Sequence, residues 1–276
     1  MRQLLSIAVI VFLACGCSKK SQPTAPEPPP GPALPDAIRL PESSSGKPID
    51  RSVENTIFLH VNSNGEVTPP FDVKPLADLK HLENYLNLQA NSENARTGKR
   101  PMEIPILRID RETPFEKVYP IMQVCYSAYY EKYQLRVTQP STSTETQISL
   151  TFGYNYGGAI VCSNEEQPKL YAIKVVTNDA GQITGLNFRE YGSPEEEGEN
   201  LGSDLAACQQ KLTRVVEVEM KRIAHAAAKG NKVPPPELRL EIADKLRQQS
   251  VVQLLDVGIE SGFTDVRLQS TDPAHR

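Results

Sequence analysis

Tryptophan is absent from this sequence, and its 276 residues include only five cysteines and four histidines. These scarce residues form no known reactive pattern: there is no CxxC pair, no His and Cys spacing that suits zinc, no GxSxG nucleophile, and no HExxH or paired-Asp metal motif. None of the histidines has a Cys, Ser or carboxylate residue at a sequence spacing that indicates a reactive site. We therefore assign no catalytic residue, no metal ligand and no cofactor-binding residue, and we expect a protein that is not an enzyme.

Excess basic charge and long apolar runs are missing as well. The formal net charge is -4 and the sequence pI is about 5.7, so there is no global basic surface and we expect no nucleic-acid partner. The uncharged run after Arg2 covers roughly 14 residues, which is too short to span ~30 Å of hydrocarbon as a helix. A run of this length behind a basic residue is instead typical of a secretory signal.

The end of that run contains a candidate anchor. Residues 13–17 read Leu-Ala-Cys-Gly-Cys, which resembles the lipobox of bacterial lipoproteins, where a Cys after small residues becomes the acylated mature N-terminus. We predict a signal peptide at residues 1–17 and lipidation of Cys17, which fits better than Cys15; an ordinary signal peptide with incidental cysteines is the alternative. Lipidation implies the cell envelope, facing the periplasm. Ser18 stands where an Asp retains some lipoproteins in the inner membrane, and this weakly favours the outer membrane.

Proline clustering marks the next segment. The 23 prolines are unevenly distributed along the chain. Residues 25–32 and 43–46 are too rich in Pro, Ser and Gly to form a hydrophobic core. We predict a disordered tether at residues 18–52, whose extended form would reach on the order of 90 Å.

Three cysteines remain after the anchor, namely Cys125, Cys162 and Cys208. An odd number cannot pair completely within the chain. Cys125 falls on the apolar stripe of a predicted helix, which favours a buried thiol, but a disulfide among the three is left open.

The remaining sequence repeats one pattern in residues 53–163 and 164–270, before a tail at 271–276. Each copy predicts a strand, a Gly turn, a strand, a helix, a strand, an Asp, a helix and a strand, with positive φ at Gly65 and Gly181. The predicted helices cover residues 75–88, a segment that buries residues 118, 121, 122, 125 and 129, and a segment from 203 or 204 to 229. Matching Asp110 with Asp244 aligns the second helix of each copy without a gap. The fold class predicted is α+β, with two tandem two-layer domains of ββαβαβ type.

The recurring Asp110 and Asp244 have three possible roles. No base or nucleophile stands beside either one, which argues against catalysis, and a contact with a partner is the second possibility. The favoured role is structural: an Asp at the end of a strand can accept hydrogen bonds from the amides that begin the next helix. Thr113 and Glu116 add the spacing of a capping box to the first copy.

This pattern resembles the periplasmic domain of the ExbD/TolR biopolymer-transport family. The resemblance rests on residues 107–111 (Leu-Arg-Ile-Asp-Arg) with Pro114, Phe115 and Val118, and on residues 240–244 (Leu-Glu-Ile-Ala-Asp) and 262–266 (Gly-Phe-Thr-Asp-Val). It implies non-enzymatic work at a membrane, beside a proton-driven motor, by dimeric domains that contact envelope proteins or peptidoglycan. Family members have a transmembrane helix with an Asp, whereas this apolar run contains no Asp, Glu or Lys, so proton coupling is not expected.

These observations lead to a function hypothesis with two alternatives. The first is a lipid-anchored, non-catalytic binding or scaffold protein of the envelope, in which the two copies pack as an intramolecular pseudo-dimer, or in which the chain forms a homodimer. The second is an accessory subunit of an ExbB/TolQ-type transport complex, and the third is an envelope hydrolase. The sequence does not identify the partner or the residues that bind it.

Overall fold

The computed structural model describes residues 38–49, 56–70, 72, 74–97, 104–152, 168–192 and 198–272. These residues all belong to one compact unit, residues 32–276. The predicted signal peptide, Cys17 and the tether up to residue 37 lie outside the described residues, as do Cys162 and most of the tail.

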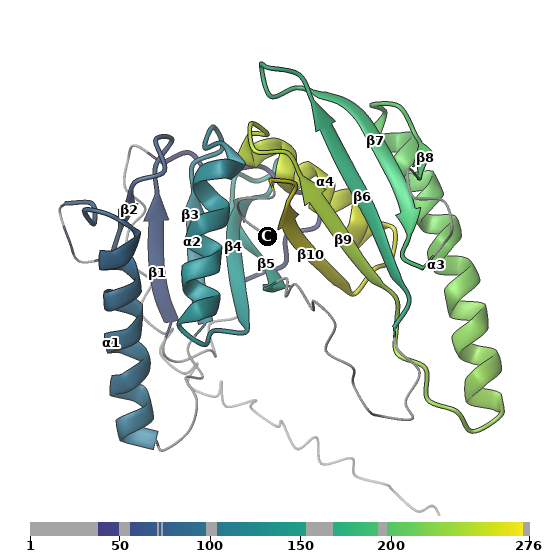
Figure 1. Ribbon diagram of the computed structural model, residues 1–276, viewed down its shortest axis with the longest axis horizontal. Coiled ribbons are helices and arrows are strands. Elements are labelled where there is room, and N and C mark those ends of the chain that lie inside the picture. The colour runs from purple at the N-terminus through teal and green to yellow at the C-terminus, as the bar shows by residue number, and fades with distance from the viewer. Residues whose placement is uncertain are drawn as a thin grey trace, which may run out of the picture. The chain divides into compact units, whose positions relative to one another are not determined.

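The described part is a mixed α+β structure with two five-stranded sheets and four helices (Figure 1). The first half contains β1 (Thr56–Val61), β2 (Val67–Thr68), α1 (Leu79–Thr97), β3 (Ile104–Ile109), α2 (Phe115–Ser127), β4 (Lys132–Thr138) and β5 (Glu145–Thr151). The second half contains β6 (Leu170–Thr177), β7 (Ile183–Glu190), β8 (Glu199–Asn200), α3 (Leu205–Ala228), β9 (Glu237–Ile242), α4 (Gln248–Glu260) and β10 (Asp265–Ser270). The predicted α+β class is confirmed.

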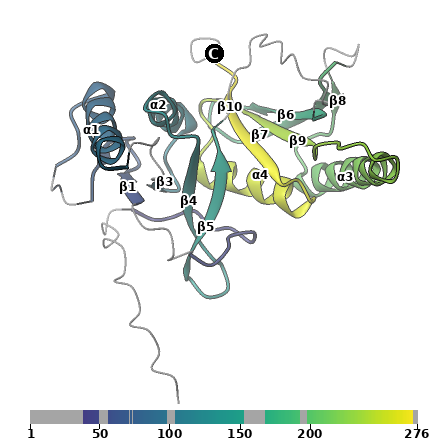
Figure 2. The same ribbon diagram turned by 90° about the horizontal axis from the view of Figure 1, so that it is seen from below.

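The two halves share one sheet topology. The first sheet has the order β2-β1-β3-β4-β5, and the second has β8-β7-β6-β9-β10 when read from the opposite edge. In each sheet three neighbouring strands are parallel, β1-β3-β4 and β6-β9-β10, and the hairpin partner of the first is antiparallel. Each half adds one strand to this common set, β5 to the first and β8 to the second. Figure 2 shows α1 and α2 on one face of the first sheet, and α3 and α4 on one face of the second sheet.

The repeat is offset by one residue from the sequence alignment. Ile104 and Glu237, Phe115 and Gln248, and Lys132 and Asp265 begin equivalent elements that are all separated by the same 133 positions. Asp110 therefore corresponds to Ala243, and the alignment of Asp110 with Asp244 is wrong. The reason is that the recurring Asp was matched in preference to the Leu-x-Ile alternation of the preceding strands, which sets the side-chain phase.

Helix boundaries were predicted with mixed success. α3 begins after Asp204, whose carboxylate accepts a hydrogen bond from the Ala206 amide, and it ends before Gly230 at φ +81°, as predicted. α2 buries the predicted apolar stripe except Tyr129, which is 71% exposed. Tyr129 lies beyond the helix at φ +70°, at the position where the second half has Gly262.

One core serves both halves. Buried apolar side chains of both sheets and of all four helices form a single connected cluster. Among the described residues, no helix is long and apolar enough to cross a membrane.

Residues 38–47 form an ordered segment, the strap, inside the predicted tether. Ile38 and Leu40 are both 6% exposed, and Lys47 pairs with Gln147 of β5 through two backbone hydrogen bonds of 2.9 Å. The prediction of a disordered tether up to residue 52 is therefore wrong for this segment. Its composition cannot build a core alone, but backbone pairing and contacts with both halves order it.

Candidate functional site: the joint between the halves

The two halves meet at equivalent turns before α2 and α4. The Phe115 amide donates to the Leu246 carbonyl at 2.9 Å, and the Gln248 amide donates to the Thr113 carbonyl at 2.9 Å. Phe115 and Gln248 are equivalent positions, as are Thr113 and Leu246, so the contact is reciprocal. We call these paired turns, residues 110–116 and 243–249, the joint.

A second reciprocal pair extends the joint. The Glu116 amide donates to the Asp244 carbonyl at 2.9 Å, and the Gln249 amide donates to the Arg111 carbonyl at 3.0 Å. Amides in the first turn of a helix have no partner within the helix. Each half therefore satisfies the helix start of the other half.

This arrangement replaces the predicted capping box. The residue before α2 is Pro114, and no side chain caps the helix. Thr113 instead donates its hydroxyl hydrogen to the Asn62 carbonyl at 3.0 Å. The capping-box prediction is wrong because the Glu116 amide is already bonded to the Asp244 carbonyl of the other half, and the Thr113 amide to the Asp110 carbonyl of its own half.

Asp110 and Asp244 have structural contacts that differ from those predicted. Asp110 is 1% exposed and accepts from the Glu112 amide at 2.9 Å and the Arg39 amide at 2.8 Å, so it holds a turn and the strap. Asp244 accepts from the Ser270 hydroxyl at 3.1 Å. In the part of the chain that the structure describes, neither carboxylate bonds an amide at the start of a helix.

Asp256 of α4 fixes the strap to the second half. Its Oδ1 accepts from the Ser43 hydroxyl at 2.6 Å and also from the Ser45 hydroxyl, and its Oδ2 accepts from the Ser44 amide at 3.0 Å. Asp256 is 8% exposed and Ser43 is 1% exposed. A buried carboxylate needs such donors because an unpaired charge away from water is costly.

The strap also bonds residues on both sides of the joint. The Gln249 side chain accepts from the Glu42 amide at 2.8 Å and donates to the Glu42 carbonyl at 3.0 Å. On the other side, the Ser43 amide donates to the Thr138 carbonyl at 3.0 Å in the first half. The strap is therefore a third component of the joint.

Gln248 is a poorly satisfied side chain in the joint. It is 1% exposed, and neither its Oε1 nor its Nε2 has a hydrogen-bond partner among the described residues. Its counterpart Phe115 is fully buried and apolar. The second half therefore buries an amide where the first half buries a ring.

A buried polar cluster lies on the face of the first sheet opposite its helices. Arg108 bonds Glu145 at 3.0 and 3.1 Å, while Arg136 lies 3.7 Å from the same carboxylate. Burial, with a smaller effect of the Arg108 charge, lowers the pKa of His60 to about 4. Burial also lowers the pKa of Arg136 to about 10. His60 is therefore neutral at pH 7.

The second sheet has a comparable cluster. Glu241 accepts from Arg189 and from the Tyr191 hydroxyl, and the guanidinium groups of Arg189 and Arg239 lie 4.7 and 5.3 Å from the centre of the Tyr191 ring. Burial raises the pKa of Glu237, against the opposing charge of Arg267. In both clusters a carboxylate is paired with arginine: Glu145 with Arg108 and Arg136, and Glu241 with Arg189.

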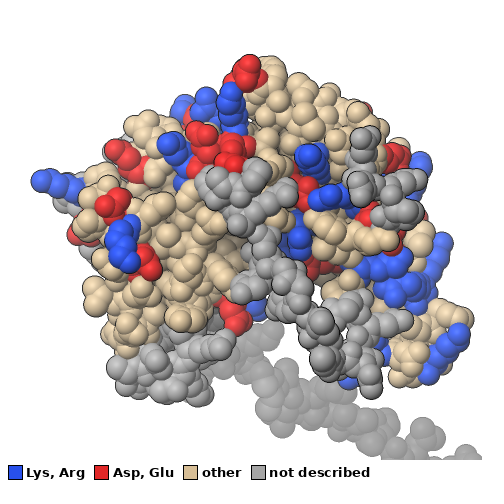
Figure 3. All heavy atoms as spheres, in the orientation of Figure 1, with Lys and Arg blue, Asp and Glu red and all other residues tan. Residues whose placement is uncertain are grey.

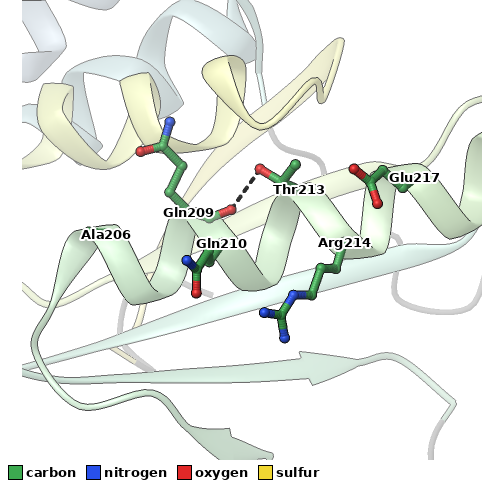
Figure 4. A pocket seen from close by; sticks show the side chains of 6 residues that line it. All are labelled: Ala206, Gln209, Gln210, Thr213, Arg214 and Glu217. Atoms are coloured by element: carbon green, nitrogen blue, oxygen red, sulfur yellow. Dashed lines mark hydrogen bonds between the residues drawn. The ribbon is translucent and has the colours of Figure 1, made fainter.

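A shallow hollow of about 440 Å³ follows α3. In Figure 4, Gln210 and Arg214 point away from the helix, while Gln209 extends toward α4, where it bonds Glu260 at 3.1 Å. Glu217 is the single carboxylate of the lining. This hollow lacks the paired groups that acid–base or nucleophilic catalysis requires.

The cysteines add no reactive group to the described part. Cys125 and Cys208 are free and buried, as expected for Cys125, and burial raises the thiol pKa values to about 12 and about 11. Within the described ranges, no group of three or more His, Cys, Asp or Glu residues is placed to hold a metal ion.

Comparison with models of known protein families, with curated proteins and with solved structures found no match. The joint is therefore supported by its own hydrogen bonds and burial. Sequence reasoning missed the strap, the reciprocal amides and Asp256. Only Asp256 had a visible signal, because it is a charged residue within the apolar run from Leu254 to Val257.

Proposed function

We propose that this chain is a lipid-anchored, non-catalytic binding or scaffold protein of the cell envelope, built from two ExbD/TolR-like halves that pack as an intramolecular pseudo-dimer. The observation that carries the proposal is the reciprocal pairing of the joint. Equivalent residues exchange equivalent hydrogen bonds, which is the relation expected of an isologous dimer interface.

The topology and the strap also support the proposal. A βαβ-containing set of four strands and two helices occurs twice, in the order implied by the resemblance. The strap lies within the predicted tether, after residues 18–37, and bonds both halves. A mechanical force on the lipid anchor would therefore be transmitted to the folded residues at the joint.

Crosslinking in the intact envelope tests the function. Cells that express the full chain are treated with a short crosslinker, and the species captured with it are identified by mass spectrometry. We expect one envelope protein, or fragments of peptidoglycan, to be enriched over a control that carries Cys17→Ser. Equal capture by the two chains contradicts a specific, anchor-dependent partner.

The same capture distinguishes the alternative function. Enrichment of integral membrane subunits of a proton-driven motor would identify the chain as an accessory subunit of a transport complex. Lipidation itself is checked by metabolic labelling with an acyl chain, which we expect the full chain to incorporate and Cys17→Ser to lose.

A further inference from the structure

α3 extends beyond the body that it packs against. Its buried residues are Cys208, Leu212 and Glu219, and no residue after Glu219 is fully buried. Figure 1 shows its C-terminal part running past the ends of the neighbouring strands. The last turns of α3 therefore stabilise no core, although the helix continues for nine residues after Glu219.

One face of α3 carries mainly basic side chains, with the exposed Glu217 at its edge. Residues spaced three or four apart lie on one side of a helix. The residues of this basic stripe are Lys211, Arg214, Val218, Lys221, His225 and Lys229. They cover ~27 Å at 1.5 Å per residue, and Figure 3 shows Lys and Arg side chains gathered over α3 at the margin of the molecule.

The positive charge of the stripe is only partly offset, by Glu199 beside Lys211 and by Glu217, which lies three residues from Arg214 and four from Lys221. Among the described residues, Arg214, Lys221 and Lys229 have no ion-pair partner, and all three are exposed. Glu219 points inward, where it bonds Arg222 at 2.7 Å and the Tyr171 hydroxyl at 2.9 Å. Only Lys211 is paired, with Glu199. The stripe is thus a local excess of positive charge on a chain whose net charge is -4.

One apolar side chain lies among these charges. Val218 is 63% exposed within the stripe. Basic residues next to exposed aliphatic ones are typical of helices that lie at a membrane interface, where the charges meet anionic headgroups and the apolar groups enter the boundary. A second copy of the same stripe is a poorer occupant, because like charges repel.

We propose that the basic stripe of α3 binds the anionic headgroups of a phospholipid membrane. The contact is separate from the acyl anchor at Cys17 and would orient the folded body on a membrane surface. It does not depend on the identity of the partner sought by crosslinking.

Vesicle sedimentation tests this proposal without the acyl chain. Residues 18–276 keep the whole compact unit 32–276 and omit the signal and the lipidated Cys. We expect this protein to sediment with vesicles of phosphatidylglycerol and phosphatidylcholine, and not with phosphatidylcholine alone. High salt should release it, because screening weakens the interaction of exposed charges.

The variant Arg214→Gln/Lys221→Gln/Lys229→Gln should lower the partition coefficient on the order of 100-fold, given the usual contribution of each cation near an anionic surface. The matched control is Lys74→Gln/Lys132→Gln/Lys174→Gln, which removes the same charge from exposed sites elsewhere and should bind as the unmodified protein does. Circular dichroism confirms that both variants fold.

Two results would overturn the proposal. One is equal binding by the stripe variant and the control variant, or no preference for anionic vesicles. The other is a concentration-dependent dimer that the stripe variant abolishes, since this would assign the face to a second copy. Failure here leaves the crosslinking result unaffected, so the two proposals fail separately.

Discussion

Gln248 and Gln249 are neighbours at the joint with opposite hydrogen bonding. Gln248 is buried and neither of its amide atoms has a hydrogen-bond partner among the described residues, whereas Gln249 exchanges two hydrogen bonds with Glu42 of the strap. We expect Gln248→Met to raise the free energy of unfolding by about 1 kcal/mol, because it removes a desolvated amide at nearly constant volume. Gln249→Met should lower it by about 1–2 kcal/mol. Denaturant unfolding measures both, and the same sign for both variants would contradict the described burial.

Asp256 should contribute to the free energy of unfolding through its hydrogen bonds with the strap. Asp256→Asn keeps the side-chain size but turns one acceptor for the Ser43–Ser45 donors into a donor, and charge-assisted bonds are the stronger kind. We expect a loss of about 2 kcal/mol in the free energy of unfolding. The control Asp179→Asn, at a fully exposed carboxylate paired with Lys245, should have little effect. Equal effects would mean that the strap is not fixed there.

The burial of His60 makes the free energy of unfolding depend on pH, and the sign of this dependence follows from the lowered pKa. Its pKa is lowered from 6.5 in the unfolded chain to about 4 in the folded one, so the unfolded chain binds the proton more readily between these values. The contribution is fully present above pH 6.5 and is lost as the pH falls toward 4, by up to about 3 kcal/mol. Unfolding measured across this range should show a shallower slope for His60→Gln. An unchanged slope would show that His60 is not buried in the neutral form.

At the scale of elements, the turns connect the hairpins to the joint. Gly181, at φ +75° between β6 and β7, has no room for a side chain, because a Cβ would lie 2.3 Å from the Lys245 carbonyl oxygen. Gly202 has nearly the same φ of +73°, but a Cβ there would meet nothing within 4 Å. We expect Gly202→Ala to cost about 1 kcal/mol from backbone strain alone and Gly181→Ala about 3 kcal/mol or more. Equal losses in thermal and denaturant unfolding would contradict the close packing.

Elements with local signals were predictable. The Gly65 and Gly181 turns and the Asp204 cap of α3 depend on residues within a few positions of one another, so their chemistry is visible in the sequence. The local sequence also predicted a capping box at Thr113 and Glu116. It does not form, because the Glu116 amide bonds the Asp244 carbonyl of the other half.

The strap and the joint were not predictable because their bonds join distant segments. Ser43 bonds Asp256 across 213 positions, and nothing in a Pro- and Ser-rich segment indicates such a partner. The two copies were aligned one residue out of register for a related reason. The alignment followed the shared Asp and not the alternation of apolar residues, which determines which side chains face the core.

At the scale of the whole molecule, the halves depend on each other. The helix starts of each half are satisfied by carbonyls of the other, the strap bonds both, and buried apolar residues of both form one cluster. Separating the halves would expose these amides and part of the core to water together. The body should therefore unfold as one cooperative unit.

The absence of tryptophan allows a direct test of this cooperativity. The variant Tyr85→Trp places a single indole on α1 of the first half, and the variant Tyr191→Trp places one in the second half, so each fluorescence change has one origin. We expect the two variants to unfold in single transitions of similar denaturant dependence, because a two-state body exposes both probes at once. Adding Gly181→Ala, which perturbs only the second half directly, should move the midpoint seen by the first-half probe as far as that seen by the second-half probe. A first-half probe that does not respond would show that the halves fold separately and that the joint is only a weak contact between them.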